Sequence, residues 1–305
     1  MKKIVVIGSL NMDVVIETPY MPKCGETIAG KNVNLVPGGK GANQAYAAGK
    51  LGGNVTMIGA VGKDAAGNEL LQNLKGVGVD VSGVCQMTEG TTGQAFIAVD
   101  DNGDNSIIII AGTNGMITKK LIDDNSHIIK ESDIVIMQLE IPIDIVEYVK
   151  EIAIREEKTV IIDPAPAVRD IPDNFWNGID YIKPNETELA ILTGVQPETQ
   201  EELIMAARMM INKGVRNVIV TLGGEGCLLV TKHTEEFFKS YRVKAVDTTA
   251  AGDSFTAAFA LALSQGKTCR EAIKLGQKVS SIVVTRKGAP VSYTHLTLPT
   301  TSREE

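Results

Sequence analysis

The chain has 305 residues, of which 44% are hydrophobic, 22% charged and 4% aromatic, and its formal net charge is −7. This composition is typical of a globular domain and excludes collagen, coiled coil and wholesale disorder. The acidic balance disfavours a general nucleic-acid binder, and no apolar run approaches the roughly 18 residues that a membrane span needs. The apolar run after Lys2 and Lys3 is short, so we expect a first strand there and not a signal peptide.

Cysteine and histidine positions do not have the spacing of a metal centre. Cys24, Cys85, Cys227 and Cys269 include no C-x-x-C pair, and the three histidines lie far apart. A structural zinc site is therefore not expected. We expect the thiols to be reduced and buried, in a cytoplasmic protein.

Short β-branched runs alternate with longer helical patterns along most of the chain. The pattern predicts strands at 3–8, 55–61, 133–138, 159–163, 180–183 and 217–222. It predicts helices at 41–51, 65–75, 143–156, 199–213, 252–264 and 270–284. This alternation indicates an α/β fold with a mainly parallel central sheet and helices on both faces.

Two regions break this alternation and predict a small separate sheet. Residues 12–36 contain strand-like pieces with Pro and Gly between them, and residues 91–112 read as a hairpin around the turn DNGDN. We expect these two excursions to form a β lid that could also pair with another subunit. Residues 291–305 are rich in Thr and Ser without a clear period, and are expected to be peripheral.

The segment 247–259 predicts an anion-binding helix start. Ala250, Ala251 and Gly252 precede a strong helical pattern, so an anion could approach the free N–H groups of the first turn closely. Asp253 in that turn could cap the helix, or it could act as a general base beside a bound phosphate. Asp247 could be a second ligand or an acceptor that stabilises the loop.

A glycine-rich loop at 38–43 leads into the first predicted helix. Its Gly39, Lys40, Gly41 and Ala42 allow the backbone to approach a small polar ligand, and Asn43 can both donate and accept hydrogen bonds to hydroxyls. The loop lacks the G-x-x-x-x-G-K-[ST] pattern of a nucleotide-binding P-loop. It could also be a simple turn at the start of the helix.

Polar residues follow several predicted strands, where open α/β sheets bind ligands. Asn11 and Asp13 follow the first strand and Glu140 follows the strand at 133–138, and each could instead be a turn or solvated residue. Asn185 and Glu188 could form a helix capping box or hold water around Mg²⁺. The glycine-rich segment at the end of the strand at 217–222 could form a tight turn or support a nucleotide. It comprises Thr221, Leu222, Gly223, Gly224, Glu225 and Gly226.

Taken together, these motifs resemble the ribokinase (PfkB) family of carbohydrate kinases over roughly residues 3–289. The matching segments are GSLNMD, GGKGANQA, KPNETE, VTLGGEG, AVDTTAAGDSF and VTRKGA. The resemblance implies a ribokinase-like three-layer α/β/α domain over 1–290 with a β-sheet lid. It also implies ATP-dependent phosphorylation of D-ribose at O5, a homodimer formed through the lid, and use of Mg²⁺ and an activating K⁺.

The resemblance assigns site residues by position. The sugar would be bound by Asn11, Asp13, Gly39, Lys40, Gly41, Ala42, Asn43, Glu140 and Asp253. Asp253 would be the catalytic base, beside an anion hole formed by the backbone of Ala250, Ala251 and Gly252. ATP would be bound by Asn185, Glu188, Thr221, Leu222, Gly223, Gly224, Glu225, Gly226, Gly252, Asp253 and Gln277, with Glu188 linked to Mg²⁺. Potassium would be bound by Asp247, Thr249, Val283, Arg286, Gly288 and Ser292.

Beyond Ala289 the likeness to the family ends, and we hypothesise that 291–305 is foreign or misassembled sequence. Three other functions stay open from the sequence. The protein could be another kinase of the family, acting on deoxyribose, fructose or a nucleoside, or a catalytically silent sugar-binding regulator. A nicotinamide-dependent oxidoreductase is disfavoured because G-x-G-x-x-G is absent.

Overall fold

A nine-stranded sheet forms the centre of the described chain, which comprises residues 1–286 of a computed structural model. Its strand order is β13-β12-β11-β10-β9-β8-β1-β4-β5, and neighbours are parallel from β11 to β5. The hairpin β12–β13 extends one edge in antiparallel register. The strands are β1 (Ile4–Ile7), β4 (Val55–Gly62), β5 (Asp80–Met87), β8 (Ile134–Gln138), β9 (Thr159–Asp163), β10 (Tyr181–Ile182), β11 (Asn217–Thr221), β12 (Cys227–Thr231) and β13 (Glu235–Phe238).

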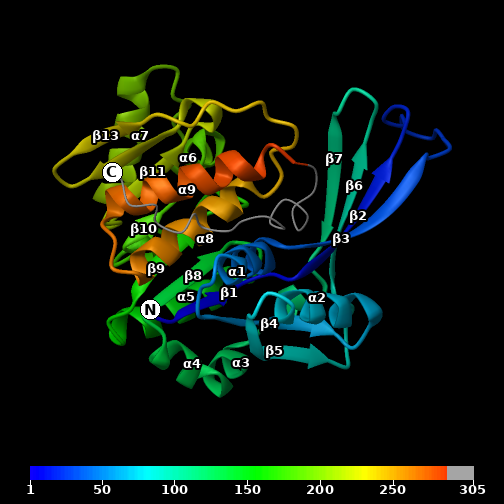
Figure 1. Ribbon diagram of the computed structural model, residues 1–305, viewed down its shortest axis with the longest axis horizontal. Coiled ribbons are helices and arrows are strands. Elements are labelled where there is room, and N and C mark those ends of the chain that lie inside the picture. The colour runs from blue at the N-terminus through cyan, green and yellow to red at the C-terminus, as the bar shows by residue number, and fades with distance from the viewer. Residues whose placement is uncertain (287–305) are drawn as a thin grey trace, which may run out of the picture.

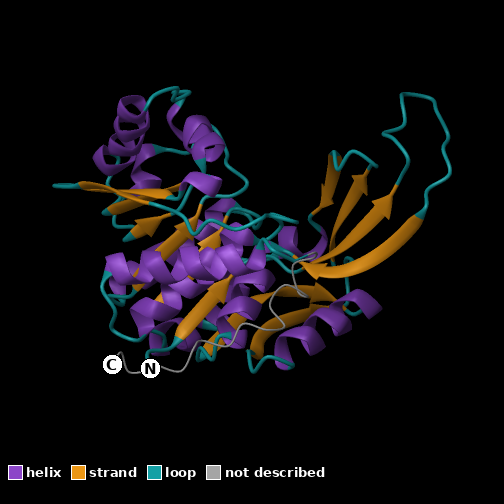
Figure 2. Cartoon of the chain, turned by 45° about the horizontal axis from the view of Figure 1, so that its top comes forward, coloured by secondary structure: helices purple, strands orange, loops and turns teal. Residues whose placement is uncertain are grey.

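Helices cover both faces of this sheet, as Figures 1 and 2 show. Along β1, Ile4 and Val6 belong to one hydrophobic cluster and Val5 and Ile7 to the other, because successive side chains of a strand point to opposite faces. The first cluster includes residues of α1 (Lys40–Lys50), α2 (Ala65–Lys75), α8 (Ala251–Ser264) and α9 (Cys269–Val283). The second includes residues of α3 (Lys119–Asp124), α4 (Ser126–Glu131), α5 (Ile143–Arg155), α6 (Glu186–Thr193) and α7 (Gln200–Asn212).

The predicted three-layer α/β/α architecture is therefore confirmed, and each of the six predicted strands and six predicted helices is present within about two residues of its expected ends. The sequence pattern missed β5, β12 and β13, which lie at the two edges of the sheet, and the short helices α3 and α4. Edge strand β5 is half exposed and its register is irregular, so it lacks the continuous apolar run of the central strands. A helix of six residues is too short to show a period of 3.6.

The two β excursions form a separate four-stranded sheet, as expected. Its order is β3-β2-β6-β7, with strands β2 (Asn11–Glu17), β3 (Asn32–Gly38), β6 (Gly93–Val99) and β7 (Asn105–Ile110). β6 and β7 form the predicted hairpin, and Gly103 in its turn has a φ of +87°. Figure 1 shows this sheet projecting from the main body beside the start of α1.

The cysteine prediction was only partly right. Cys24, Cys85, Cys227 and Cys269 are all unpaired, but only Cys227 is buried, whereas Cys24 and Cys85 are exposed. Cys24 lies in the loop between β2 and β3, and Cys85 lies on β5, the edge strand of the main sheet. Among residues 1–286 no helix has the length and apolar content needed to cross a bilayer. The predicted atypical tail at 291–305 lies outside the described residues.

Candidate active site

One edge of the main sheet gathers the polar residues singled out in the sequence. The carboxyl ends of the parallel strands β1, β8, β9, β10 and β11 meet there, and α1 and α8 both begin at this edge. In open α/β sheets this is the edge at which ligands bind. The projecting small sheet begins at the same place, because β2 starts only four residues after β1 ends.

The glycine-rich loop packs backbone against backbone on the turn between β1 and β2. A Cβ at Gly39 would lie 2.7 Å from the backbone nitrogen of Asn11, and a Cβ at Gly41 would lie 2.7 Å from the backbone nitrogen of Ser9. Gly39 also has a φ of +87°, a conformation that side chains disfavour. These two glycines therefore bring Lys40 and the start of α1 against the polar end of β1.

Acidic and basic side chains of the predicted sugar site lie together at this junction. Glu140 accepts hydrogen bonds at Oε2 from the Ser9 hydroxyl, at 2.5 Å, and from the Lys40 backbone N–H, at 3.0 Å. Burial, together with the nearby carboxylates of Glu140 and Asp253, raises the pKa of Asp13 to about 7, against the opposing effect of Lys40. Burial opposes the charge of Lys40, yet four carboxylates, Asp253 foremost, raise its pKa overall.

Asn11 is held in one orientation by a residue that the sequence analysis missed. Asn114, in the short 3₁₀ helix after β7, donates from Nδ2 to Asn11 Oδ1 at 2.7 Å and accepts from the Leu10 N–H at 2.9 Å. The Asn11 oxygen is therefore occupied, which leaves its amide N–H groups as the free donors. Asn114 follows the hairpin by only four residues, so the end of the small sheet fixes a side chain of the predicted sugar site.

Asp253 occupies the first turn of α8 and is 6% exposed. Its Oδ2 accepts a hydrogen bond from Asn43 Nδ2 at 3.1 Å, and its Oδ1 accepts one from Gln44 Nε2 at 3.0 Å. Burial raises the pKa of Asp253 and Asp163 adds to the increase, whereas Lys40, Gln44 and Asn43 lower it. The carboxylate points to α1 and does not cap its own helix, so the capping alternative was wrong.

The N-terminus of α8 matches the predicted anion cradle in part. Ala250 precedes the helix with a φ of +57° and contributes no capping side chain. The Ala251 N–H is bonded to the Thr248 carbonyl at 3.2 Å, whereas no described group accepts from the amides of Gly252 and Asp253. Two free amides at the positive end of a helix favour an anion at this position.

A buried polar network that the sequence analysis did not assign lies beneath this helix end. Gln44 Nε2 also donates to Asp163 Oδ2 at 3.0 Å, while its Oε1 accepts from Gln138 Nε2 at 2.7 Å. Asp163 pairs with Lys183 at 3.3 Å, with both side chains less than a tenth exposed. Gln138 and Asp163 are the last residues of β8 and β9, so the strand-end rule used for Asn11 and Glu140 could have found them.

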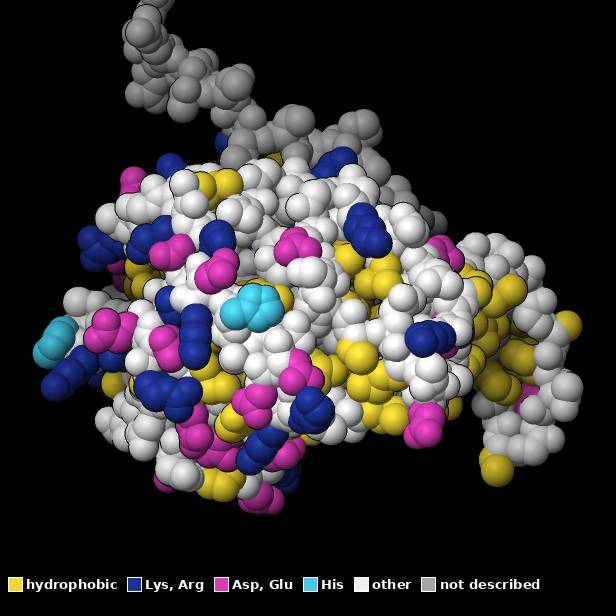
Figure 3. All heavy atoms as spheres, turned by 90° about the horizontal axis from the view of Figure 1, so that it is seen from below, with side chains coloured by type: hydrophobic (Ala, Val, Ile, Leu, Met, Phe, Trp, Pro, Cys, Tyr) yellow, Lys and Arg dark blue, Asp and Glu magenta, His cyan; other side chains and the backbone are white. Residues whose placement is uncertain are grey.

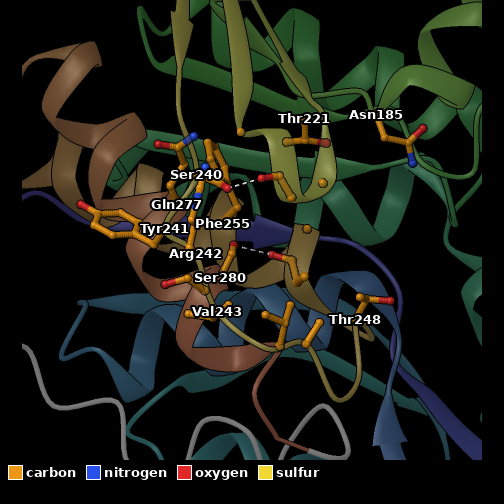
Figure 4. A pocket seen from close by; sticks show the side chains of 18 of the residues that line it. Asn185, Thr221, Ser240, Tyr241, Arg242, Val243, Thr248, Phe255, Gln277 and Ser280 are labelled. Atoms are coloured by element: carbon orange, nitrogen blue, oxygen red, sulfur yellow. Dashed lines mark hydrogen bonds between the residues drawn. The ribbon is translucent and has the colours of Figure 1, made fainter.

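A cavity of about 660 Å³ opens beside α8 and contains most of the predicted nucleotide residues (Figure 4). Its lining includes Asn185, Thr221, Gly223, Gly224, Gly226, Ala251, Gly252 and Gln277. Four other residues predicted to bind ATP do not line it: Glu188, Leu222, Glu225 and Asp253. Tyr241, Arg242 and Val243 line it but were missed, because they belong to an irregular loop after β13 that has no periodic signal.

Hydrogen bonds fix two of the predicted nucleotide residues. Gln277 is buried, and its Nε2 donates to the Phe238 carbonyl at 3.0 Å. Asn185 and Glu188 form the capping box at the start of α6, with bonds of 2.7 and 2.8 Å. Burial raises the pKa of Glu188, helped by Asp163 and opposed by Lys183.

The segment predicted to bind potassium is drawn together by backbone bonds. The amides of Val246 and Asp247 both donate to the Val284 carbonyl, at 2.7 and 3.2 Å, which joins the loop before α8 to the end of α9. Asp247 Oδ1 accepts from the Thr249 N–H at 2.8 Å, as the loop-stabilising alternative required. Gly288 and Ser292 lie outside the described residues.

Comparisons with known proteins agree with this geometry. The signature of the pfkB family carbohydrate kinases matches residues 1–295. The chain is 39% identical to the ribokinase of Haemophilus influenzae over 291 residues and 37% identical to the deoxyribokinase of Salmonella typhi over 290, with 95% of both chains covered in each case. The structure of Arabidopsis thaliana ribokinase complexed with ribose and ATP matches at a TM-score of 0.90 and 36% identity over 95% of both chains. The chain therefore belongs to the pfkB family of carbohydrate kinases.

Proposed function

We propose that the protein transfers the γ-phosphoryl group of ATP to the O5 hydroxyl of D-ribose, giving D-ribose 5-phosphate and ADP. One observation supports this above the others: Asp253 lies beside two free helix-terminal amides and is hydrogen-bonded to Asn43, next to the polar cluster of Asp13 and Lys40. A base, an anion cradle and a hydroxyl-binding cluster are the parts that phosphoryl transfer to a sugar needs. The ribokinase relatives support ribose as the sugar.

In this proposal the carboxylate of Asp253 accepts the proton of the O5 hydroxyl as O5 attacks the γ-phosphorus. The new O5–P bond forms while the bond from phosphorus to the β–γ bridging oxygen breaks, and ADP leaves with that oxygen. The amides of Gly252 and Asp253 stabilise the charge on the transferring phosphoryl group. Asn43 and Gln44 hold one oxygen each of the Asp253 carboxylate, so the base meets the sugar in one orientation.

Both proposed cations have oxygen donors among the described residues. Glu188, through water, would hold Mg²⁺, which usually takes few protein ligands and keeps several waters; when bound, Mg²⁺ neutralises the β- and γ-phosphate charge. Potassium would be held by the Asp247 carboxylate and by carbonyls of Thr249, Val283, Arg286 and Gly288, with Ser292 completing the set. Among residues 1–286 no cluster of three or more His, Cys, Asp or Glu side chains has the geometry of a metal site.

We propose one kinase domain that spans residues 1–290, followed by a foreign sequence at 291–305. Within this domain the small sheet would act as a lid over the sugar and as the contact surface of a dimer. Ile107, Ile108, Ile109 and Ile110 of edge strand β7 are each about half exposed or more. Figure 3 shows hydrophobic side chains gathered at the right-hand end of the molecule, which this sheet forms. An apolar edge strand of this kind is a surface that pairs with another chain. Because ATP is an intracellular nucleotide, a cytoplasmic location is part of the same proposal.

Deoxyribose is the second candidate substrate, because a deoxyribokinase is 37% identical to the chain and a ribokinase 39%. A panel of D-ribose, 2-deoxy-D-ribose, D-fructose and adenosine with ATP distinguishes them when ADP release is coupled to NADH oxidation. The proposal expects the highest kcat/KM for D-ribose and a product phosphorylated at O5 by ³¹P NMR. A higher value for another sugar would reassign the substrate within the family. Sugar binding by calorimetry without turnover would instead support the silent regulator.

A further inference from the structure

Lys183 is a buried cation that the mechanism above does not use. It follows β10 directly, and its side chain is 7% exposed. Among residues 1–286 its ammonium forms one ion pair, with Asp163 Oδ2 at 3.3 Å. That distance is longer than the 2.7–2.9 Å or so of a charge-assisted hydrogen bond. An ammonium carries three N–H donors, so Lys183 has donors that the protein itself does not satisfy.

The ammonium lies directly beneath the first turn of α8. A Cβ added to Gly252 would lie 3.3 Å from Lys183 Nζ, tight enough to crowd the ammonium. Glycine at 252 therefore leaves room for the ammonium against the turn of α8 that lines the nucleotide cavity, although Lys183 itself is not one of the lining residues. The free Gly252 and Asp253 amides belong to the same turn.

Two positive groups, the helix end and the Lys183 ammonium, therefore lie together, with Asp163 in contact with the ammonium and Glu188 within electrostatic reach of it. The helix end carries about half a positive charge, and a buried charge with unsatisfied donors is costly. Asp163 offsets part of this charge, but it is shared with Gln44 and Thr256, at 3.0 and 3.3 Å. An anion over the Gly252 amide would satisfy both the helix end and the ammonium.

We propose that Lys183 donates a hydrogen bond to the phosphoryl group that is transferred, as a second cationic group of the catalytic site. Chain order indicates which phosphate of the nucleotide lies here. Asp253 is the residue next to Gly252, and it is the proposed base for the hydroxyl that receives the phosphoryl group. The anion nearest to Gly252 is therefore the γ-phosphoryl and not the rest of the nucleotide. This inference rests on the proposed function.

Variants at 163 and 183 test the proposal. Lys183→Met alone leaves the Asp163 carboxylate buried without its cation. Two further variants are therefore compared, Asp163→Asn and the double variant Asp163→Asn/Lys183→Met. In the double variant both side chains of the pair are uncharged and similar in size to the originals. In the Asp163→Asn background, removal of Lys183 is expected to lower kcat on the order of 100-fold, the usual cost of one donor to a transition-state oxyanion. Lys183→Arg is expected to recover part of that loss, because guanidinium also donates to phosphate.

Nucleotide binding gives a readout that a structural role would not move. Calorimetry with β,γ-methylene-ATP and with ADP, both with Mg²⁺, is expected to show at least about a tenfold loss for the triphosphate between Asp163→Asn and the double variant, and little change for ADP. Equal kcat in these two variants, or equal losses for both nucleotides, would overturn the proposal and make Lys183 a counter-ion of Asp163. Failure of the wild-type protein to phosphorylate ribose would overturn the proposed function, while the nucleotide comparison would still decide the role of Lys183.

Discussion

Gln44 Nε2 donates to Asp253 Oδ1 at 3.0 Å, and the same nitrogen donates to Asp163 Oδ2 at 3.0 Å. Its amide cannot turn over, because Gln44 Oε1 accepts from Gln138 Nε2 at 2.7 Å. One fully buried side chain thus fixes both the proposed base and the partner of Lys183.

Replacing Gln44 by Leu is expected to raise the pKa of Asp253, because the hydrogen bond from Gln44 lowers it. The base must be ionised, so the acid limb of the kcat/KM profile should move to higher pH, because a hydrogen bond that favours the charged carboxylate is lost. Gln72→Leu on the exposed face of α2 serves as the control. An unmoved acid limb in Gln44→Leu would show that Gln44 contributes to packing alone.

Replacing Asp253 by Asn is expected to lower kcat by about 10²–10⁴-fold while ribose still binds, because the shape of the site is kept and the proton acceptor is lost. Steady-state kinetics and ribose calorimetry measure the two effects. Asp144→Asn is the matched control, since Asp144 also lies in the first turn of a helix, α5, but is exposed. Turnover near the wild-type value in Asp253→Asn would remove the base assignment.

Asp13 is expected to make the folded protein less stable as the pH rises. Its pKa is about 7 when folded, against an ordinary 3.8, so the folded state holds a proton that the unfolded chain has released between these values. Stability therefore falls from about pH 4 to pH 7 and the loss persists above. Asp13→Asn should raise the melting temperature at pH 8 by about 2–4 °C and leave it unchanged at pH 3.5.

The control for this prediction is Glu17→Gln at the exposed end of the same strand, β2. Thermal unfolding followed by circular dichroism at both pH values provides the measurement. The same Asp13→Asn variant should weaken ribose binding, because the carboxylate is a proposed sugar ligand. An equal change in melting temperature at pH 3.5 and pH 8 would contradict the charge argument.

Potassium is expected to raise kcat/KM by at least about fivefold when KCl replaces NaCl at constant ionic strength, as is usual for coupled sites. The physical reason is that Asp247 and Thr249 belong to the loop that leads into the α8 cradle, so a cation there would order the amides. Asp247→Asn should abolish the response. A flat titration of the wild-type enzyme would leave Asp247 with a structural role only.

The exposed isoleucines of β7 are expected to hold a dimer. Ile108 is 65% exposed on an edge strand, so Ile108→Lys places a charge where a second chain would pack. Sedimentation velocity should show a wild-type dimer that becomes a monomer in this variant. Met205→Lys on α7, at 52% exposure, is the control for a surface charge elsewhere. A wild-type monomer at micromolar concentration would rule out the dimer contact.

Local patterns were enough to predict the layers of the fold and most of the segments that meet at the candidate site. Buried strands such as Ile134–Gln138 are continuously apolar, and helix starts such as Asn185 and Glu188 carry their own capping signal, so neighbours in sequence determine them. The glycines at 39 and 41 and the small residues before Asp253 likewise indicated backbone that a ligand approaches. Edge strands and the loop at 241–243 gave no such signal, because their environment comes from distant parts of the chain.

Sequence by itself determined that a carboxylate follows a run of small residues at a helix start, and that polar groups follow apolar strands. Only the tertiary structure decided which of these groups meet. Asp253 is turned toward Asn43 and Gln44, more than 200 positions away in the chain, and so does not cap its own helix. The surroundings of Lys183 are likewise set by residues distant in the chain, since Gly252 and Asp163 lie beside its ammonium. Burial and charge at a site are sums over residues that only folding brings within a few ångströms.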